Sequence, residues 1–408
     1  MDWVNAALWH DCCEAFSRRR ASAGTHTTRT KAGMVYTLAL RNFIHDRVSL
    51  IVTLVGIVFS VVLMAIQIGL YYGSEQVISS MIEHSGAQLW ITPIGAQSFD
   101  DSPLLKGGEK YAALSRPGVA AAIDVAVKIM AWKRSDGGSQ AVVVVGTDPD
   151  DKGLVAWNLI AGAPDDIYKP NAVIADKAYL GQMQVKGIGD SGEINGQKAV
   201  IVAITDHIRS FTTLPYLFTT LTRARTYMHA APDQSGFVMI RVKPDAKLET
   251  VRADLQKNLR DVDVLTNQEF LDRSVHHWLF ATGAGAALIA GAVLGLIVGV
   301  VVVAQTLYAS TKDHLNEFAT LRALGASSGY IIRVILVQAV LSAIIGYLIG
   351  MAEALAINWA TRDTQLVILL TPMLALSLFL ITLGMCVFSA ISAIVKVTRI
   401  DPAMVFSR

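Results

Sequence analysis

Few residue patterns in this chain of 408 residues could perform chemistry. Residues 187–192 fit GxGxxG, a pattern that in dinucleotide-binding folds lies between a strand and a helix, so that the phosphates rest on the helix N-terminus. Here the glycines lead into Glu193-Ile194-Asn195-Gly196, and Asn-Gly is a strong signal for a two-residue hairpin turn. The sequence therefore predicts a β-turn region at this point and not a nucleotide site.

Other catalytic and metal-binding patterns are missing from the sequence. It contains no G-x-x-x-x-G-K-[ST] phosphate loop, no H-E-x-x-H pair and no Cys-x-x-Cys pair. His276 and His277 are adjacent, but neighbouring residues point to different faces of a helix, so a position at the membrane interface beside Trp278 is the simpler interpretation. We therefore predict no catalytic residue, no metal site and no directly bound cofactor, and we expect that the chain is not an enzyme.

The composition indicates a membrane protein. Hydrophobic residues make up 53% of the chain and charged residues 17%, with a mean hydropathy of +0.45, whereas roughly 25% charged residues is typical of soluble proteins. Three cysteines, Cys12, Cys13 and Cys386, are too few for a small fold held together by several disulfides. The net charge of +2 shows no basic excess of the kind that nucleic-acid-binding proteins carry.

Four stretches are long and apolar enough to cross a bilayer, which takes about 20 residues of helix. They lie at 50–70, 278–307, 331–358 and 365–395. The predicted fold class is thus an α-helical membrane protein with four transmembrane helices and a mixed α/β extracytoplasmic domain inserted between helices 1 and 2. That domain, at 71–277, is long enough for a core of its own and includes helical stalks that continue the spans.

The distribution of charge predicts the orientation in the membrane. Residues 71–277 hold 21 Lys/Arg and 24 Asp/Glu, a net charge of −3, so the rest of the chain carries +5. Because basic residues near the spans stay inside, we predict a multi-pass membrane protein with both termini cytoplasmic. The remaining segments are a disordered tail at 1–33, an interfacial segment at 34–49, a cytoplasmic segment at 308–330 and a C-terminal tail at 396–408. The sequence leaves open whether Met1 or Met34 is the true start.

Short apolar runs and turn signals predict the elements of the inserted domain. Asp136-Gly137-Gly138 predicts a hairpin, and periodic apolar residues predict helices at 248–259 and 268–277. Residues 75–84 are expected to extend the first span outward. The predicted strands are 88–92, 126–132, 141–146, 199–204 and 237–242.

Small residues recur at four-residue spacing in two of the predicted spans. These helix-packing candidates are Gly291, Gly295 and Gly299 in the second span and Gly346 and Gly350 in the third. Glycines at this spacing let two helix backbones approach closely. Two interpretations remain open, packing within one chain or an interface between two copies of it.

The segment Lys312–Gly325 has the sequence KDHLNEFATLRALG. Its apolar residues at 315, 318, 321 and 324 recur every three residues, so the stripe drifts around a helix and makes no clean amphipathic face. Such a segment either lies on the membrane surface or docks on a partner protein.

Residues 317–326, EFATLRALGA, resemble the E-I-G-x-L-R-A-L-G-A segment of MacB-type ABC transporter permeases. This family is also called type VII or mechanotransmission and belongs to the FtsX/MacB permease superfamily. Leu40-Arg41-Asn42 with residues 53–57 resembles the family's entry into its first helix, and Asp401-Pro402-Ala403 resembles its C-terminal tail. Residues 215–220, PYLFTT, are similar to an outer-domain segment of the DevC-like subgroup.

The resemblance implies a homodimeric permease subunit of the bacterial cytoplasmic (inner) membrane, surrounded by membrane lipids, that docks a separate ABC ATPase. ATP would bind to that ATPase, and its hydrolysis would move the extracytoplasmic domain to drive efflux or export, with a periplasmic adaptor (membrane fusion) protein and an outer-membrane duct. FtsX-like signalling to a cell-wall hydrolase and lipoprotein release are the alternatives, and the size of the inserted domain favours export. By position, the ATPase-coupling residues implied by the resemblance are Glu317, Phe318, Leu321, Arg322, Leu324 and Gly325.

Overall fold

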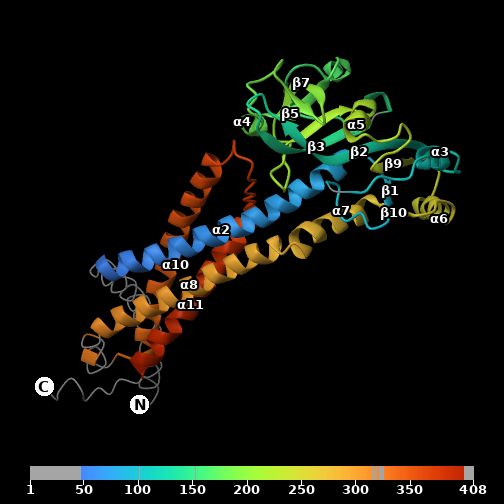
Figure 1. The fold of residues 1–408 in the computed structure, drawn as a ribbon. Helices are drawn as coiled ribbons and strands as arrows, with labels where there is room; N and C mark the ends of the chain where they lie inside the picture. Colours follow the sequence, from blue (N-terminus) through green and yellow to red (C-terminus); the bar gives the residue numbers. More distant parts are fainter. Residues whose placement is uncertain are drawn as a thin grey trace, which may run out of the picture. The chain divides into compact units, whose positions relative to one another are not determined.

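The structure, a computed structural model, describes residues 47–100, 102–151, 153–314, 317, 319–320 and 326–398 (Figure 1). By their internal contacts the described residues form two units. The helical unit holds 47–67, 291–357 and 370–398, and the outer unit holds 68–290 and 358–369. The tail predicted at 1–33, almost all of the segment 34–49 and most of the tail at 396–408 lie outside the described residues.

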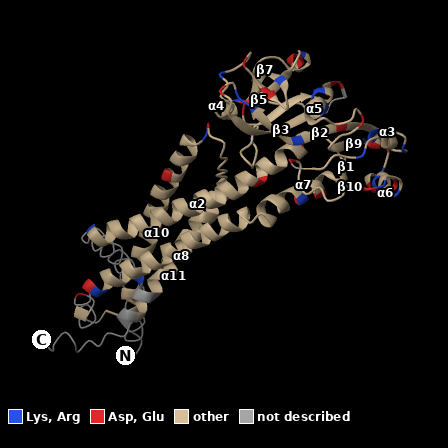
Figure 2. Cartoon of the chain, in the orientation of Figure 1, with Lys and Arg blue, Asp and Glu red and all other residues tan. Residues whose placement is uncertain are grey.

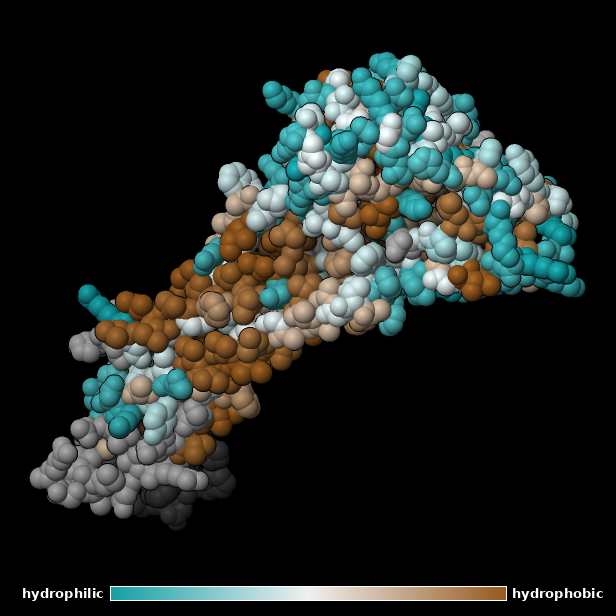
Figure 3. All heavy atoms as spheres, viewed as in Figure 1, coloured by the Kyte–Doolittle hydropathy of each residue, from teal (hydrophilic) through white to brown (hydrophobic). Residues whose placement is uncertain are grey.

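Four helices of the described chain are long and apolar enough to cross a membrane. They are α2 (Arg47–His84), α8 (Ala284–Asp313), α10 (Ser328–Ala360) and α11 (Pro372–Thr398). Charged residues are sparse along them (Figure 2), and apolar side chains gather on their surface (Figure 3). At 1.5 Å per residue, the 38 residues of α2 extend about 57 Å, nearly twice the roughly 30 Å of a hydrocarbon core. The first span therefore continues outward as a stalk, as the sequence predicts.

Two predicted span boundaries are wrong. The sequence predicts the second span at 278–307, but α8 begins only at Ala284, after a π-helix at His277–Ala281 and a turn in which Gly283 has φ +80°. It predicts the fourth span at 365–395, but α11 begins at Pro372, and residues 361–371 form a turn and an extended segment. Proline lacks the N–H that a helix interior needs and fits the first turn of a helix, so it begins this helix and cannot lie within it.

Ten strands of the outer unit form one mixed sheet in the described chain. The hydrogen-bonded order is β10-β1-β9-β2-β3-β8-β5-β7-β4, with β6 paired to β2 and β7. The pairs β3:β8 and β5:β7 are parallel and the others are antiparallel. The strands are β1 (Leu89–Pro93), β2 (Val119–Lys133), β3 (Ser139–Thr147), β4 (Leu159–Ala161), β5 (Ala172–Asp176), β6 (Ser191–Ile194), β7 (Gln197–Thr205), β8 (Tyr216–Thr220), β9 (Phe237–Val242) and β10 (Val262–Thr266).

Short helices complete the outer unit and make it a mixed α/β domain, as predicted. The α-helices are α3 (Glu109–Leu114), α4 (Leu180–Met183), α5 (Leu221–Met228), α6 (Leu248–Asn258) and α7 (Asn267–His276). Single 3₁₀ turns occur at Pro149–Asp151, Pro164–Tyr168 and Lys177–Tyr179.

Both predicted hairpins are confirmed. β2 and β3 pair antiparallel on either side of residues 134–138. Asn195 (φ 47°) and Gly196 (φ 77°) connect β6 to β7, and this left-handed backbone at two successive residues is the reason for the Asn-Gly pair. The GxGxxG match covers the turn before β6 and the first two residues of that strand, and β7 follows where a dinucleotide site would need a helix.

The core of the outer unit lies on both faces of the sheet. Val143 and Val145 point into one apolar cluster, whereas Val142 and Val144 point into another. This alternation explains why 141–146 reads as an unbroken apolar run, since a strand covered on both faces has no solvent side.

Candidate functional site

Two neighbouring strands join the outer unit to the membrane helices. β1 follows α2, and β10 precedes α7, which leads toward α8. The two strands pair antiparallel from Leu89↔Thr266 to Pro93↔Val262. Because β1 follows α2 after four residues and β10 runs directly into α7, this ladder joins the end of the first membrane helix to the helix that leads into the second. We call it, with the first two turns of α7, the stalk junction.

Buried side chains hold α7 against this ladder. The indole Nε1–H of Trp90 donates to Asn267 Oδ1 over 2.8 Å, and the Asn267 backbone N–H donates to Gln88 O over 3.1 Å. The rings of Trp90 and Phe270 are both fully buried, with centroids 5.2 Å apart. The start of α7 therefore cannot shift without disturbing β1.

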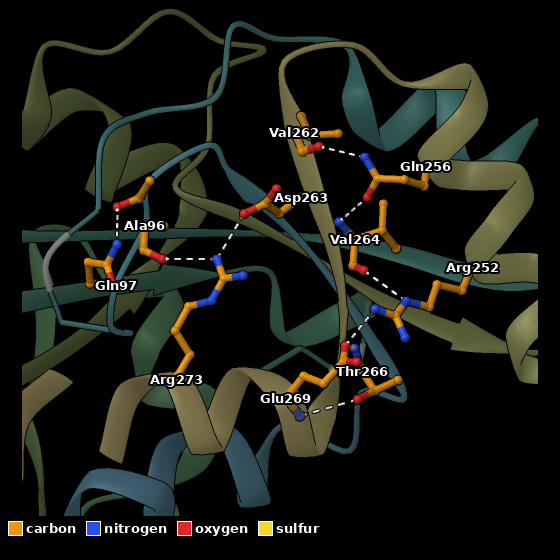
Figure 4. A network of polar contacts seen from close by, with 11 residues as sticks. Ala96, Gln97, Arg252, Gln256, Val262, Asp263, Val264, Thr266, Glu269 and Arg273 are labelled. Atoms are coloured by element: carbon orange, nitrogen blue, oxygen red, sulfur yellow. Dashed lines mark hydrogen bonds and ion pairs between the residues drawn. The ribbon is translucent and has the colours of Figure 1, made fainter. Parts of the chain in front are cut away.

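A capping box fixes the first turn of α7 (Figure 4). Thr266 Oγ1 accepts from the Glu269 N–H at 3.2 Å, and the Thr266 N–H donates to Glu269 Oε2 at 3.0 Å. Arg252 Nη2 lies 2.8 Å from the same carboxylate. Burial opposes the charged form of Glu269, but the Thr266 hydrogen bond and the Arg252 guanidinium outweigh it and lower the pKa of Glu269.

The next turn of α7 is anchored by Arg273. Its Nη1 lies 2.8 Å from Asp263 Oδ2 on β10 and 3.4 Å from Ala96 O in the loop after β1 (Figure 4). One guanidinium thus connects α7, which together with the π-helix after it we call the second stalk, to β10 and to the loop after β1. Charge-assisted contacts of this kind are stronger than neutral hydrogen bonds.

The free edge of β10 is closed by side chains from α6. Gln256 Nε2 donates to Val262 O at 3.0 Å, and Gln256 Oε1 accepts from the Val264 N–H at 2.8 Å. Arg252 Nε donates to Val264 O at 3.1 Å (Figure 4). These side-chain hydrogen bonds take the place of the backbone hydrogen bonds that a further strand would make. This edge of the sheet is therefore protected from pairing with another chain.

The predicted histidine pair lies at the end of α7. The His276 ring is stacked near Phe280, and the His277 ring packs edge-on against Trp278. The described residues include no group of three or more His, Cys, Asp or Glu side chains that could hold a metal ion. The π-helix and Gly283 that follow interrupt the helix between α7 and α8.

Only part of the predicted coupling segment is described. Glu317 is exposed, and its Oε2 lies 3.1 Å from His314 Nδ1. Ala319 is 3% exposed and belongs to the core of the helical unit together with Val303 and Ile331. Among the described residues of the segment, Ala319 is thus packed into the core, whereas Glu317 presents an exposed carboxylate. Phe318, Leu321, Arg322, Leu324 and Gly325 lie outside the described residues.

The five glycines singled out in the sequence face partners within the helical unit. A Cβ on Gly346 would lie 2.5 Å from Ile57 Cγ2, and one on Gly350 would lie 2.9 Å from Val61 Cβ, both on α2. Ser60 Oγ donates to Gly295 O at 2.8 Å, so the backbones of α2 and α8 are close. A Cβ on Gly291 would meet Gln67, one on Gly295 would meet Leu63 and Met64, and one on Gly299 would meet Ser60 and Met385. Packing within one chain accounts for these glycines.

Sequence reasoning missed the polar residues of the stalk junction. Thr266-x-x-Glu269 carries the pattern of a capping box and could have been found from its spacing. The partners Arg252, Gln256 and Arg273 could not, because they reach β10 only after the sheet has formed.

Comparison with known proteins gives two matches to family models along the chain. The MacB-like periplasmic core domain matches residues 50–258, about half of the chain, and the FtsX-like permease C-terminal domain matches residues 289–402. Among curated proteins, none matches.

Solved structures resemble the outer unit at low identity. The periplasmic region of MacB from Actinobacillus actinomycetemcomitans shows 12% identity and a TM-score of 0.35, covering 46% of this chain and 92% of that one. The extracellular domain of the ABC-type transporter YknZ from Gram-positive bacteria shows 11% identity and a TM-score of 0.33, covering 44% and 99%. A domain of a putative permease from Porphyromonas gingivalis shows 14% identity and a TM-score of 0.30, covering 45% and 89%.

The two family models follow each other along the chain in the order of its parts. The first covers a membrane helix and most of the α/β domain, and the second covers the three later membrane helices. The chain belongs to the MacB/FtsX family of ABC-type permeases.

Proposed function

We propose that this chain is the permease subunit of an ABC exporter and converts ATP hydrolysis on a separate ATPase into movement of its outer domain. The observation that carries the proposal is the stalk junction, where the strands that continue the first and second membrane helices pair with each other. A change in the relative position of the two helices is passed to the sheet through this ladder. No path for substrate through the membrane is needed.

The coupling segment is the proposed docking site of the ATPase. Glu317 presents an exposed carboxylate within this segment, while Ala319 attaches the segment to the core of the helical unit. Docking there would move α8 and α10, which flank the segment. Phe318, Leu321, Arg322, Leu324 and Gly325 complete the proposed contact on the basis of the family resemblance. With the coupling segment on the cytoplasmic side of the membrane, both termini are cytoplasmic as well.

Export with a periplasmic adaptor is favoured over FtsX-like signalling by the match of the MacB-like periplasmic core domain to residues 50–258. The chain would work as a homodimer. Since the five glycines face partners within the same chain, the dimer contact would use another surface of the helices.

Co-purification tests the docking assignment. The double variant Glu317→Lys, Leu321→Asp should lose the ATPase from the purified membrane complex while membrane insertion is retained. The matched control, Glu83→Lys with Leu114→Asp, places the same changes on exposed residues of the outer unit and should keep the ATPase. Retention of the ATPase by the first variant would contradict the assignment.

A further inference from the structure

The connection between α10 and α11 belongs to the outer unit. Residues 358–369, which we call the strap, group by their contacts with the outer domain, although the helices on either side belong to the helical unit. The strap begins in the last turn of α10 and continues as a turn and an extended segment. Its attachment therefore needs an explanation in terms of particular contacts.

One attachment is to the first stalk. The Leu369 N–H donates to Gly69 O on α2 over 2.9 Å. Gly73, one turn further along α2, lies directly under the strap, because a Cβ there would be 1.9 Å from Val367 O. Gly69 and Gly73 form a GxxxG pair that receives an extended segment where such pairs usually receive a helix.

The second attachment is to the loop between β7 and β8. Arg209 is only 6% exposed, and its Nη2 donates to Arg362 O over 2.7 Å. Its Nε has no hydrogen-bond partner in the described part of the chain. An arginine buried in this way, bound to a backbone carbonyl, is costly to place, so its position indicates a function beyond filling space. The exposed pair Lys177–Asp363, at 4.0 Å, adds little.

The loop that carries Arg209, residues 206–215, is itself fixed to the sheet and to the second stalk. The Ile208 N–H donates to Asp176 Oδ2 at 2.8 Å, and the Ser210 N–H donates to Tyr179 Oη at 2.9 Å. The Phe211 ring packs against Trp278 of the π-helix, with centroids 5.6 Å apart. This loop therefore contacts the end of β5, the second stalk and the strap, and we call it the hub loop.

We propose that the strap is a further mechanical connection between the outer domain and the membrane helices α10 and α11, with Arg209 as its positioning residue and Gly73 as its seat on the first stalk. The inference rests on the proposed function and extends it. Movement of the outer domain must either carry the outer ends of α10 and α11 along or break the bonds at Arg362 and Leu369. All four membrane helices are then linked to the outer domain, and not only the two that continue into its strands.

Hydrogen exchange of the purified full-length chain tests the connection without any ATPase. Arg209→Ala perturbs it from the hub loop and Gly73→Ala perturbs it from the stalk. Each should speed exchange on the order of tenfold at the Leu369 amide. The effect should reach Leu374 and Ala375 in the first turn of α11, whose N–H groups bond to Thr371.

Arg116→Ala is the matched control, since Arg116 is a partly exposed arginine on the outer domain that pairs with Asp254. It should leave exchange in the strap unchanged. A folded Arg209→Ala protein with unchanged exchange at Leu369 and in α11 would overturn the proposal, and Gly73→Ala provides the same test should Arg209→Ala fail to fold. If exchange responds as expected while no ATPase co-purifies with the wild-type chain, the strap connection stands and the proposed function fails. If the ATPase co-purifies and exchange does not respond, the proposed function stands and the strap connection fails.

Discussion

The helical unit and the outer unit are held together by different kinds of contact. In the helical unit, glycines on α8 and α10 receive side chains of α2, and the hydroxyl groups of Ser60, Tyr347 and Ser389 donate to backbone carbonyls of neighbouring helices. In the outer unit, side chains such as Gln256 and Arg252 take the place of a missing strand. The difference follows from the surroundings. In lipid, burial of apolar side chains does not drive helices together, so close packing must hold them. In water, an unpaired strand edge can pair with another chain unless other groups cover it. Packing faults should therefore dominate in one unit and lost polar contacts in the other.

The largest effect is expected from a buried carboxylate of the outer unit. Asp176 is 1% exposed and accepts from the N–H groups of Ala178 and Ile208 and from the Thr205 hydroxyl. Asp176→Asn would turn an amide NH₂ toward one of these donors and should cost about 2–3 kcal/mol of unfolding free energy. Thermal unfolding of the full chain measures this. Asp165→Asn, at an exposed carboxylate, is the control and should change little.

A glycine of the helical unit gives the corresponding packing test. The Cβ of Gly346→Ala would meet Ile57 Cγ2 at 2.5 Å and should cost about 1–3 kcal/mol. Gly384→Ala in α11 is the matched control because its Cβ meets no atom within 4 Å, so the lower flexibility of alanine should leave stability unchanged or slightly higher. Equal losses of stability in the two variants, measured by thermal unfolding in detergent, would contradict the view that close packing at glycines stabilises this unit.

The edge of β10 should respond next. Gln256→Ala removes both hydrogen bonds to Val262 and Val264 and should cost about 1–2 kcal/mol. It also frees the strand edge, so self-association of the variant should rise with protein concentration in light scattering. Gln256→Glu keeps only the acceptor for the Val264 N–H and should fall between wild type and Gln256→Ala.

The smallest effect is the pH dependence of the α7 cap. Because the pKa of Glu269 is lower in the fold than its ordinary value near 4.5, the stability that its carboxylate contributes is fully present above that value and is lost as the pH falls through the folded pKa. Hydrogen exchange at the start of α7 should thus lose protection on acidification below pH 4.5. In Glu269→Gln, which keeps the cap without the titrating charge, this loss of protection should be smaller. Identical pH profiles of exchange in the variant and the wild type would show that Glu269 does not cause the loss.

The sequence predicts most of the architecture because its signals are local. Apolar stretches of 20 residues and more identify the four spans, and Asn195-Gly196 identifies a hairpin from its backbone requirement alone. The starts of α8 and α11 are missed because the apolar composition begins before Gly283 and Pro372, whereas the two helices begin only after the Gly283 turn and at Pro372.

The sites depend on contacts between distant parts of the chain and are therefore harder to predict. Arg209 reaches Arg362 across 153 residues, and Trp90 reaches Asn267 across 177. No spacing in the sequence encodes such pairs. The predicted strands correspond to β1, β2, β3, β7 and β9, whereas β4, β5, β6, β8 and β10 are missed. These five strands are three to five residues long, and β10 pairs with β1 far away in the chain.

The central claim is that the state of a bound ATPase is passed to the outer domain. A spin label at Tyr111→Cys, an exposed position of the outer unit, in a chain with Cys12, Cys13 and Cys386 replaced, reports the distance between the two copies in the dimer by pulsed electron resonance. With the ATPase present, this distance should change when ATP is added to the chain with native residues at 317 and 321, and it should stay constant in the Glu317→Lys, Leu321→Asp chain, which does not hold the ATPase. A distance that stays the same while the bound ATPase hydrolyses ATP would contradict the claim.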